Sequence, residues 1–352
     1  MGMKSKKNIT INDIAKAAGV AKSTVSEVIH GNPKGRVKAE TVESITKVIK
    51  EYNYIPSSMA QAMTTKRTRQ IGYLVSSTAT LGIANNYYAE ILAGIEHCCS
   101  ESGYKCLVGR YDFSPHVADF VLNASIRQRN MDALIIAGRV NEKCQEFLAT
   151  LEFPVVIMYT DTKEKLFGFT YDECGSFVNS FKHLVEHGHH NCLLPYFCDD
   201  EYEKITTSLE MCKSSGVDIV GKLVSQPKNI NDFDFGILLA ERVFSKSSDL
   251  QTTAMVANDQ VCCAFLQKMA ELGKKCPEDF SLISTCDTPL CKWNMRPLDS
   301  FALDAFANGK TVAAKVIEHL DGKITADELK AAFRNGHAPL PVIKRGSCTK
   351  LI

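Results

Sequence analysis

A short stretch near the start of the chain concentrates polar side chains that could read a nucleic acid. A predicted helix carries five polar residues between its apolar positions: Lys22, Ser23, Thr24, Ser26 and Glu27. Ammonium, hydroxyl and carboxylate groups can reach base edges or phosphates from the major groove of DNA. The residue types therefore predict a helix whose outer face contacts DNA.

A pair of helices joined by a tight turn is predicted to position that face. Apolar residues recur at helical spacing from residue 11, and Thr10 can cap the first helix. Ala15 is small enough to let the two helices approach, and Gly19 suits the turn between them. The branched side chain of Val25 fills the angle between the helices. Residues 39–52 predict a third helix. We expect a helix-turn-helix domain, with a helical hairpin for protein contact as the alternative.

The charge of the chain is unevenly divided. The 352 residues carry a net charge of +1, but residues 1–70 hold 13 Lys/Arg against 5 Asp/Glu, a net charge of +8. The remainder is acidic, with a net charge of −7. A basic head on an acidic body predicts that only the head meets a polyanion. Apolar residues at 45% exclude wholesale disorder.

The sequence also bears on compartment. The basic start has no apolar stretch behind it, and no run of 18 apolar residues occurs, so we expect no secretory signal and no membrane span. The 14 cysteines include no C-x-x-C pair. We expect them to be reduced thiols acting as small apolar core residues in a cytoplasmic protein.

From residue 71 the pattern changes to that of an α/β body. Short apolar runs such as IGYLV, ALIIAG, PVVIMY, CLLPYF and TTAMVA alternate with amphipathic helical segments. This alternation is typical of parallel sheets covered by helices. The length predicts two doubly wound lobes, with a ligand between them at the carboxyl ends of the strands.

The head closely resembles the lactose/galactose repressor family. The resemblance rests on TINDIAKAAGVAKSTVS, on Val37 and Thr41, and on YIPSSMAQAM at residues 54–63. It implies that the second helix lies in the major groove of an operator. It also implies that residues 57–65 form a hinge helix in the minor groove, where Met63 inserts between base steps. The implied DNA contacts are Thr10, Lys22, Ser23, Thr24, Ser26, Glu27, His30, Arg36, Lys38, Tyr54, Ser57, Ala60 and Met63.

The head departs from the family pattern at three positions. Ala21 replaces a serine that caps the second helix, a loss of about 1 kcal/mol. Glu27 replaces an arginine, so the base preferred there changes, because Glu accepts from cytosine whereas Arg favours guanine. Gln61 replaces a frequent arginine, which leaves fewer phosphate contacts in the hinge.

The body resembles the periplasmic sugar-binding-protein fold as the same family carries it. Matching stretches are NNYYAEILAGIE, HLVEHGHHN, AMVANDQ, PEDFSLIS, RPLDS and LPVIKRGS. The resemblance implies a head at 8–56, a hinge and linker at 57–70, and a body at 71–348. The body's lobes are expected at about 71–160 and 161–288, joined by three crossovers. A homodimer on a palindromic operator, controlled by a small-molecule effector such as a sugar, is implied.

The match weakens at the expected effector cleft, whose residues are Tyr159, Lys204, Asn258, Cys286 and Asp287. Asn258 and Asp287 keep the residue types of the family. They are interpreted either as effector ligands or as caps at the ends of strands. The family carries Asp at the position of Cys286 and Arg at the position of Lys204. At the position of Tyr159 it often carries Asp. A site that binds the hydroxyl groups of a sugar needs carboxylates and the two-pronged guanidinium of an arginine as hydrogen-bond partners. We therefore expect a more apolar or anionic effector, or a weakened ligand response.

Other functions are weighed and set aside. A protein coregulator is disfavoured because Ala93 replaces the arginine of such members. A solute-binding protein would lack the head, and an enzyme would need a catalytic set that is not evident. His183 and His187 have a spacing that can bind zinc, but no acidic or cysteine residue stands with them in the sequence. We expect no metal and no cofactor.

Overall fold

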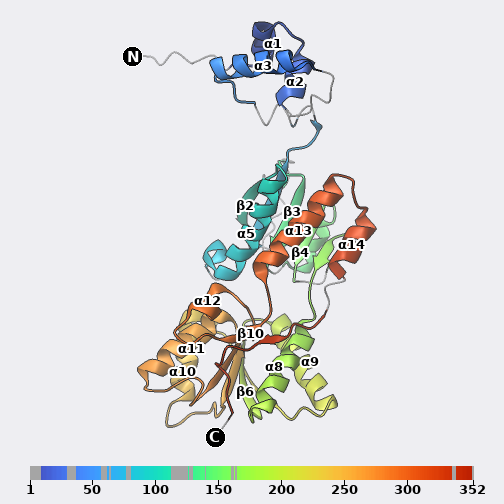
Figure 1. Cartoon of the computed structure of the whole chain (residues 1–352). Helices are drawn as coiled ribbons and strands as arrows, with labels where there is room; N and C mark the ends of the chain where they lie inside the picture. The colour runs from blue at the N-terminus through green and yellow to red at the C-terminus, as the bar shows by residue number, and fades with distance from the viewer. Residues whose placement is uncertain are drawn as a thin grey trace. The chain divides into compact units, whose positions relative to one another are not determined.

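The computed structural model divides the chain into two compact units, Met1–Arg69 and Gln70–Ile352, and each is described by itself. Figure 1 shows the elements of both units. The structure describes residues 9–29, 37–56, 62, 65–76, 81–111, 126, 130–138, 140–159, 162, 165–334 and 338–350.

The first unit contains the predicted helices. They are α1 (Ile11–Ala18), α2 (Lys22–Ile29) and α3 (Ala39–Glu51). A capping box between Thr10 and Asp13 begins α1, and Gly19 ends it with a left-handed φ of 66°. The buried core of this unit comprises Ile14, Ala15, Val25 and Ile45. The predicted cap at Thr10 is confirmed, as are the predicted turn glycine Gly19 and the buried branched residue Val25.

The second unit begins with a parallel sheet, which forms the first lobe. Its strands lie in the order β2-β1-β3-β4-β5. Their bounds are β1 (Gln70–Ser76), β2 (Lys105–Tyr111), β3 (Ala133–Ala137), β4 (Val155–Met158) and β5 (Phe167–Phe169). The helical elements of this lobe are η1 (Gly82–Ala84), α5 (Asn86–Glu101), α7 (Glu142–Leu148), α13 (Ala305–Leu320) and α14 (Ala326–Arg334). Buried side chains cover both faces of the sheet, as a doubly wound fold requires.

The second lobe is built around a sheet in the order β11-β10-β9-β8-β6-β7. Its described strand pairs are parallel except for β10 with β11. The strands are β6 (Asn191–Tyr196), β7 (Val220–Ser225), β8 (Ala254–Ala257), β9 (Ser281–Ser284), β10 (Asp299–Phe301) and β11 (Val342–Ile343). The helices are α8 (Glu173–Glu186), α9 (Asp199–Ser214), α10 (Asp232–Val243), α11 (Asp259–Glu271) and α12 (Pro289–Trp293). The predicted doubly wound class is confirmed for both lobes.

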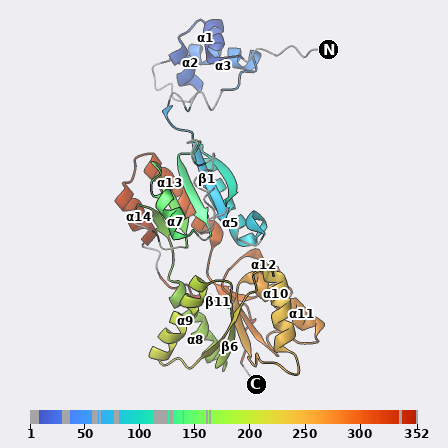
Figure 2. The same cartoon turned by 180° about the vertical axis from the view of Figure 1, so that it is seen from behind.

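The chain passes between the lobes after β5, after β10 and after α14. Figure 2 shows α13 and α14 beside the first sheet and β11 in the second lobe. The first lobe therefore extends past residue 160, where the sequence analysis ended it, because β5 pairs with β4 and α14 packs on β5. A strand of three residues, such as β5, gives too short a pattern to locate from sequence.

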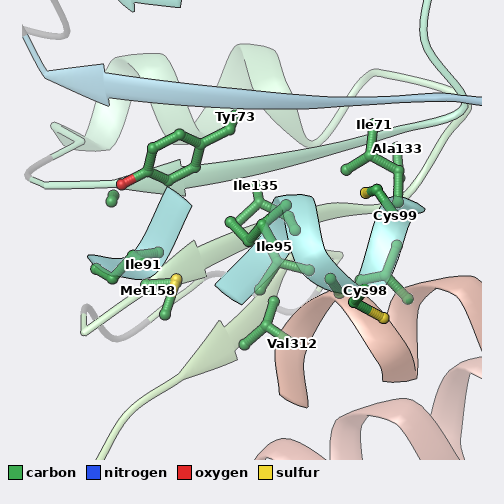
Figure 3. Close-up of a cluster of buried hydrophobic side chains, with 14 of the residues drawn as sticks. Ile71, Tyr73, Ile91, Ile95, Cys98, Cys99, Ala133, Ile135, Met158 and Val312 are labelled. Atoms are coloured by element: carbon green, nitrogen blue, oxygen red, sulfur yellow. The ribbon is translucent and has the colours of Figure 1, made fainter. Parts of the chain in front are cut away.

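The core of the first lobe explains the close packing of α5 against α13. Side chains from β1, β3, α5 and α13 meet there, among them Ile71, Ile135, Ile95 and Val312 (Figure 3). A Cβ at Gly94 of α5 would lie 2.1 Å from a backbone oxygen of α13. The glycine is required because the two helix backbones approach closely.

All 14 cysteines are free in the structure, and nine are buried. Cys98 and Cys99 belong to the first-lobe core (Figure 3), and Cys262 belongs to a core of the second lobe. The predicted role of the cysteines as small core residues is confirmed for these buried thiols. Within the described residues, no helix has both the length and the apolar character that a bilayer crossing requires.

Candidate functional site

The polar residues of α2 that are predicted to contact DNA differ in their exposure. Lys22 and Ser23 are exposed, whereas Thr24, Ser26 and Glu27 are partly buried. Val25 is fully buried and anchors the helix in the core of the head. At 3.6 residues per turn, Ser23 and Glu27 lie opposite Val25 on α2, whereas Lys22, Thr24 and Ser26 lie nearer to it.

Other predicted DNA contacts of the head have structural partners. Thr10 Oγ1 accepts from the backbone N–H of Asp13 at 3.4 Å, so its hydroxyl takes part in the cap of α1. Tyr54 packs against the core of the head, and burial raises the pKa of its phenol. Lys38 is exposed at the N-cap position of α3. The remaining predicted contacts lie outside the described residues: His30, Arg36, Ser57, Ala60 and Met63.

Three tyrosines, one of them the predicted effector residue Tyr159, meet between the lobes of the body. Tyr159 follows β4, Tyr87 begins α5, and Tyr171 lies in the crossover before α8. The ring centroid of Tyr159 is 5.6 Å from that of Tyr87 and 5.8 Å from that of Tyr171. Tyr87, Tyr159 and Tyr171 also pack against a core cluster of the second lobe. These three residues, here called the tyrosine cluster, therefore join the two lobes.

The tyrosine cluster has a low-polarity environment. Burial raises the pKa of Tyr87 and of Tyr171 well above the usual value. Burial also raises the pKa of Tyr159 to about 12, although hydrogen bonds with Asn308 and Tyr87 oppose the shift. All three phenols therefore stay neutral at physiological pH and offer hydroxyl groups rather than charges.

The backbone of Tyr159 is strained. Its φ is 61°, in the left-handed region that a bulky side chain rarely adopts. Its N–H donates to the carbonyl oxygen of Phe169 at 2.6 Å, and its hydroxyl accepts from Asn308 Nδ2 at 3.1 Å. These bonds and the ring contacts hold the side chain between the lobes.

Cys286 contributes a thiol from the second lobe. It follows β9, and burial raises the pKa of its thiol well above the usual value. It lies close enough to influence the pKa of each member of the tyrosine cluster. Of the five predicted effector residues, the structure thus brings Tyr159 and Cys286 together.

The predicted polar residues of the cleft have partners within the protein. Asn258 Oδ1 accepts from the N–H of Val261 at 2.9 Å, which caps α11, and Asn258 Nδ2 donates to Asp232 at 3.1 Å. Lys204 Nζ lies 2.7 Å from Glu173 Oε2, so the charge of the lysine is balanced. These partners occupy part of the bonding capacity of each group, so a polar ligand would compete with groups of the protein for the same atoms.

Asp287 is held in the same way. Its Oδ1 lies 2.6 Å from a guanidinium nitrogen of Arg345 and accepts from Ser300 Oγ at 2.8 Å. Its Oδ2 lies 3.3 Å from Lys292 Nζ. Only a tenth of the side chain is exposed. Asp287 therefore fastens the C-terminal segment to the region that follows β9.

Two hollows are described in the body. A hollow of about 10 Å³ lies beside Asn258 and Gln226, enough for roughly one water molecule. A larger hollow of about 590 Å³ lies elsewhere, along α9 and the start of β7. It borders an edge strand and lies away from the predicted effector residues, so we do not assign it to the cleft.

Sequence reasoning missed several residues of the cleft. Tyr87, Tyr171, Asn308 and Glu173 all lie at or beside the tyrosine cluster. Adjacent tyrosines in NNYYAE were a usable signal, because such bulky rings are seldom placed at a helix start without a packing partner. Nothing in the sequence marked Asn308, which comes close only because α13 returns to the first lobe.

The comparisons with known families divide the chain as the structure does. Residues 10–57 match the family described as bacterial regulatory proteins, lacI family. Residues 181–348 match the periplasmic binding protein-like domain.

Curated relatives match over nearly the whole chain. The HTH-type transcriptional repressor PurR of Aliivibrio fischeri is 27% identical, over 89% of this chain and 92% of that protein. Catabolite control protein A of Streptococcus mutans is 25% identical, over 95% of this chain and 98% of that protein. The first of these relatives is named as a transcriptional repressor.

Solved structures share the fold. A lac repressor dimer bound to operator and an anti-inducer matches with a TM-score of 0.75 and 19% identity, over 97% of this chain and all of that chain. A complex of the transcriptional regulator CelR with cellobiose matches with a TM-score of 0.63 and 19% identity, over 96% of this chain and 99% of that chain. At this identity the likeness shows the architecture alone.

Proposed function

We propose that the chain is a DNA-binding transcriptional regulator of the lacI family of bacterial regulatory proteins. On that premise we propose that it represses transcription as a homodimer on a near-palindromic operator. The observation that carries the proposal is the polar outer face of α2, with Lys22 and Ser23 exposed, on a head of net charge +8. Two such heads placed about one helical turn apart would each read a half-site.

The hinge is the second part of the proposal. Residues 57–65 become a helix on operator DNA, and Met63 inserts between base steps of the minor groove. Met63→Gly should then reduce specific binding while much of the nonspecific binding remains. Equal loss of both affinities at one salt concentration would contradict the wedge role.

The experiment that tests operator reading uses the full chain. Sequences selected from randomised duplex DNA should form a near-palindrome, and their affinity is measured by fluorescence anisotropy at fixed salt. Lys22→Ala on α2 should lower the affinity for the selected sequence more than for random DNA. Lys47→Ala, at an exposed position of α3, removes the same charge and serves as the matched control. Equal effects of the two variants would contradict the proposed role of α2.

For the cleft we propose an effector that is flat and largely apolar, bound through Tyr159 and Cys286. The support is that the partly buried tyrosine cluster lies near the partly buried thiol of Cys286, while Lys204, Asn258 and Asp287 have partners in the protein. A sugar would compete with those contacts for the same polar atoms, and a buried polar group left without a partner costs about 1–3 kcal/mol. Relatives that bind sugars therefore make a poor guide to this effector.

A thermal-shift panel tests the effector proposal. Sugars, phosphosugars, nucleobases and small aromatic acids are added to the full chain, because a bound ligand raises the melting temperature by mass action. A shift with a planar aromatic compound, absent in Tyr159→Ala, supports the proposal. A shift with a sugar contradicts it, and silence across the panel favours a protein coregulator or a lost effector.

The proposal assigns no catalytic step and no cofactor to this chain. The support is that the groups gathered in the cleft are neutral phenols and a protonated thiol, which bind ligands but do not act as bases at neutral pH. It also places the protein in the cytoplasm, where bacterial operators are found.

A further inference from the structure

Two histidines of α8 meet a cysteine from the far end of the chain. His183, His187 and Cys348 each offer one ligand atom, and these atoms all lie within 4.8 Å of one another. His183 and Cys348 are buried, and His187 is partly buried. The sequence analysis expected no cysteine or acidic partner for the two histidines. That expectation was wrong, because β10 and the C-terminal segment bring Asp299 and Cys348 beside α8.

The hydrogen bonds fix which nitrogen of each ring is available. His183 Nε2 lies 3.0 Å from Asp299 Oδ2, and a carboxylate accepts, so Nε2 carries the proton. The neutral ring then has its lone pair on Nδ1, which is buried and has no hydrogen-bond partner. His187 Nδ1 donates to the carbonyl oxygen of His183 at 2.7 Å, which leaves the lone pair on Nε2. Both rings are thus set in the tautomer that a metal ligand needs.

Asp299 supplies the hydrogen bond that usually orients a metal-binding histidine from behind. A metal-binding histidine typically donates its other N–H to a carboxylate or a backbone carbonyl, and both arrangements occur here. The other oxygen of Asp299 accepts the backbone N–H groups of Arg345 and Gly346 at 2.7 Å and of Ser347 at 3.1 Å. The same carboxylate therefore orients His183 and fixes the segment that carries Cys348.

We propose that His183, His187 and Cys348 bind one zinc ion per chain. Two imidazoles and a thiolate are a donor set that zinc favours, with a fourth position left for water. Ligand atoms that share a tetrahedral zinc stand roughly 3.4–3.6 Å apart, given bonds of about 2.0–2.1 Å to nitrogen and 2.3 Å to sulfur. The ligand atoms lie within 4.8 Å of one another, so they would have to move closer by about 1 Å to share the ion. The thiol proton leaves to solvent as the sulfur–zinc bond forms.

The position of the site indicates what the metal does. His183 lies ten residues after the start of α8, about 15 Å along the helix from the crossover at Glu173. Zinc would tie the C-terminal half of α8 to the segment that follows β11, within the second lobe. Its effect is therefore on the stability of that lobe, independent of DNA binding and of the effector.

The test uses the full chain after treatment with a chelator. Zinc chloride alone is titrated by calorimetry, and cobalt is titrated as a spectroscopic substitute. One equivalent per chain, a sulfur-to-cobalt charge-transfer band and a rise in melting temperature with zinc are expected. Cys348→Ser should remove the charge-transfer band. His187→Gln should weaken zinc binding by at least about 100-fold, since even an outer-shell partner is worth 10–100-fold.

Two control variants match the chemistry outside the cluster. Cys106→Ser changes a partly buried thiol on β2 of the first lobe, and His190→Gln changes an exposed histidine near α8. Both should bind zinc as the unmodified chain does. Unchanged binding in Cys348→Ser and His187→Gln, or equal loss in the controls, would overturn the site. Cys348→Ser or His187→Gln could lower the melting temperature even without metal. In that case the test rests on the unmodified chain, where absence of a sulfur-to-cobalt band contradicts the proposal.

Discussion

The head and the cleft of the body use their polar residues differently. In the head, Lys22 and Ser23 of α2 are exposed at positions where the family contacts DNA. In the cleft, Asn258 and Asp287 keep the family's residue types but are bonded to Asp232 and Arg345 of the same chain. A retained residue type is therefore an incomplete guide to ligand binding in a buried site, where neighbours compete for the same atoms.

The largest expected effect comes from the small core of the head. Ile45→Ala should cost about 2–5 kcal/mol, which is comparable to the whole stability of so short a domain. Specific DNA binding should then be lost while the main melting transition of the body persists. Anisotropy and differential scanning calorimetry on the full chain measure both. Operator affinity within threefold of the unmodified chain would show that the head does not depend on this core.

The next effect tests whether Asp287 is structural. Asp287→Asn should lower the unfolding free energy of the body by about 2–3 kcal/mol without any ligand, because Arg345 loses its ionised partner. Denaturant unfolding gives the value. Asp249→Asn breaks an exposed pair with Arg242 and should change little, which makes it the matched control. If the two variants unfold alike, Asp287 is available for ligand after all.

Base reading by α2 is tested by Glu27→Arg. The variant should change the preferred base at the facing operator position from cytosine to guanine, with a discrimination of about 1–3 kcal/mol. Selection from randomised DNA followed by affinity measurements at one salt concentration shows the change. The same preferred base for both proteins would mean that residue 27 does not read that position.

The smallest expected effect concerns the cap of α11. Asn258→Ala should destabilise the body by about 1 kcal/mol, because the N–H of Val261 loses its acceptor. Asn258→Ser, which keeps a capping oxygen, should restore most of that loss. Thermal melts of both variants in the absence of ligand give the comparison. An Asn258→Ala protein as stable as the original would favour a role in ligand binding over capping.

Much of the architecture could be predicted from sequence because its signals are local. The turn of the head follows from Ala15, Gly19 and Val25, and apolar runs such as those that become β3 and β8 stand out from their polar flanks. Short elements and returning helices could not be assigned. The three residues of β5 carry no clear pattern, and α13 joins the first lobe only through contacts with distant α5.

The sequence alone determined the helix-turn-helix head, the two-lobed body and the division of charge between them, because periodicity and composition act over neighbouring residues. The tertiary structure decided which polar groups are available. Asn258 and Asp287 received partners, Tyr159 met Tyr171, and Cys348 came to His183, across 165 residues of sequence. Such contacts depend on how the sheets and crossovers fold the chain back, and no local pattern encodes them.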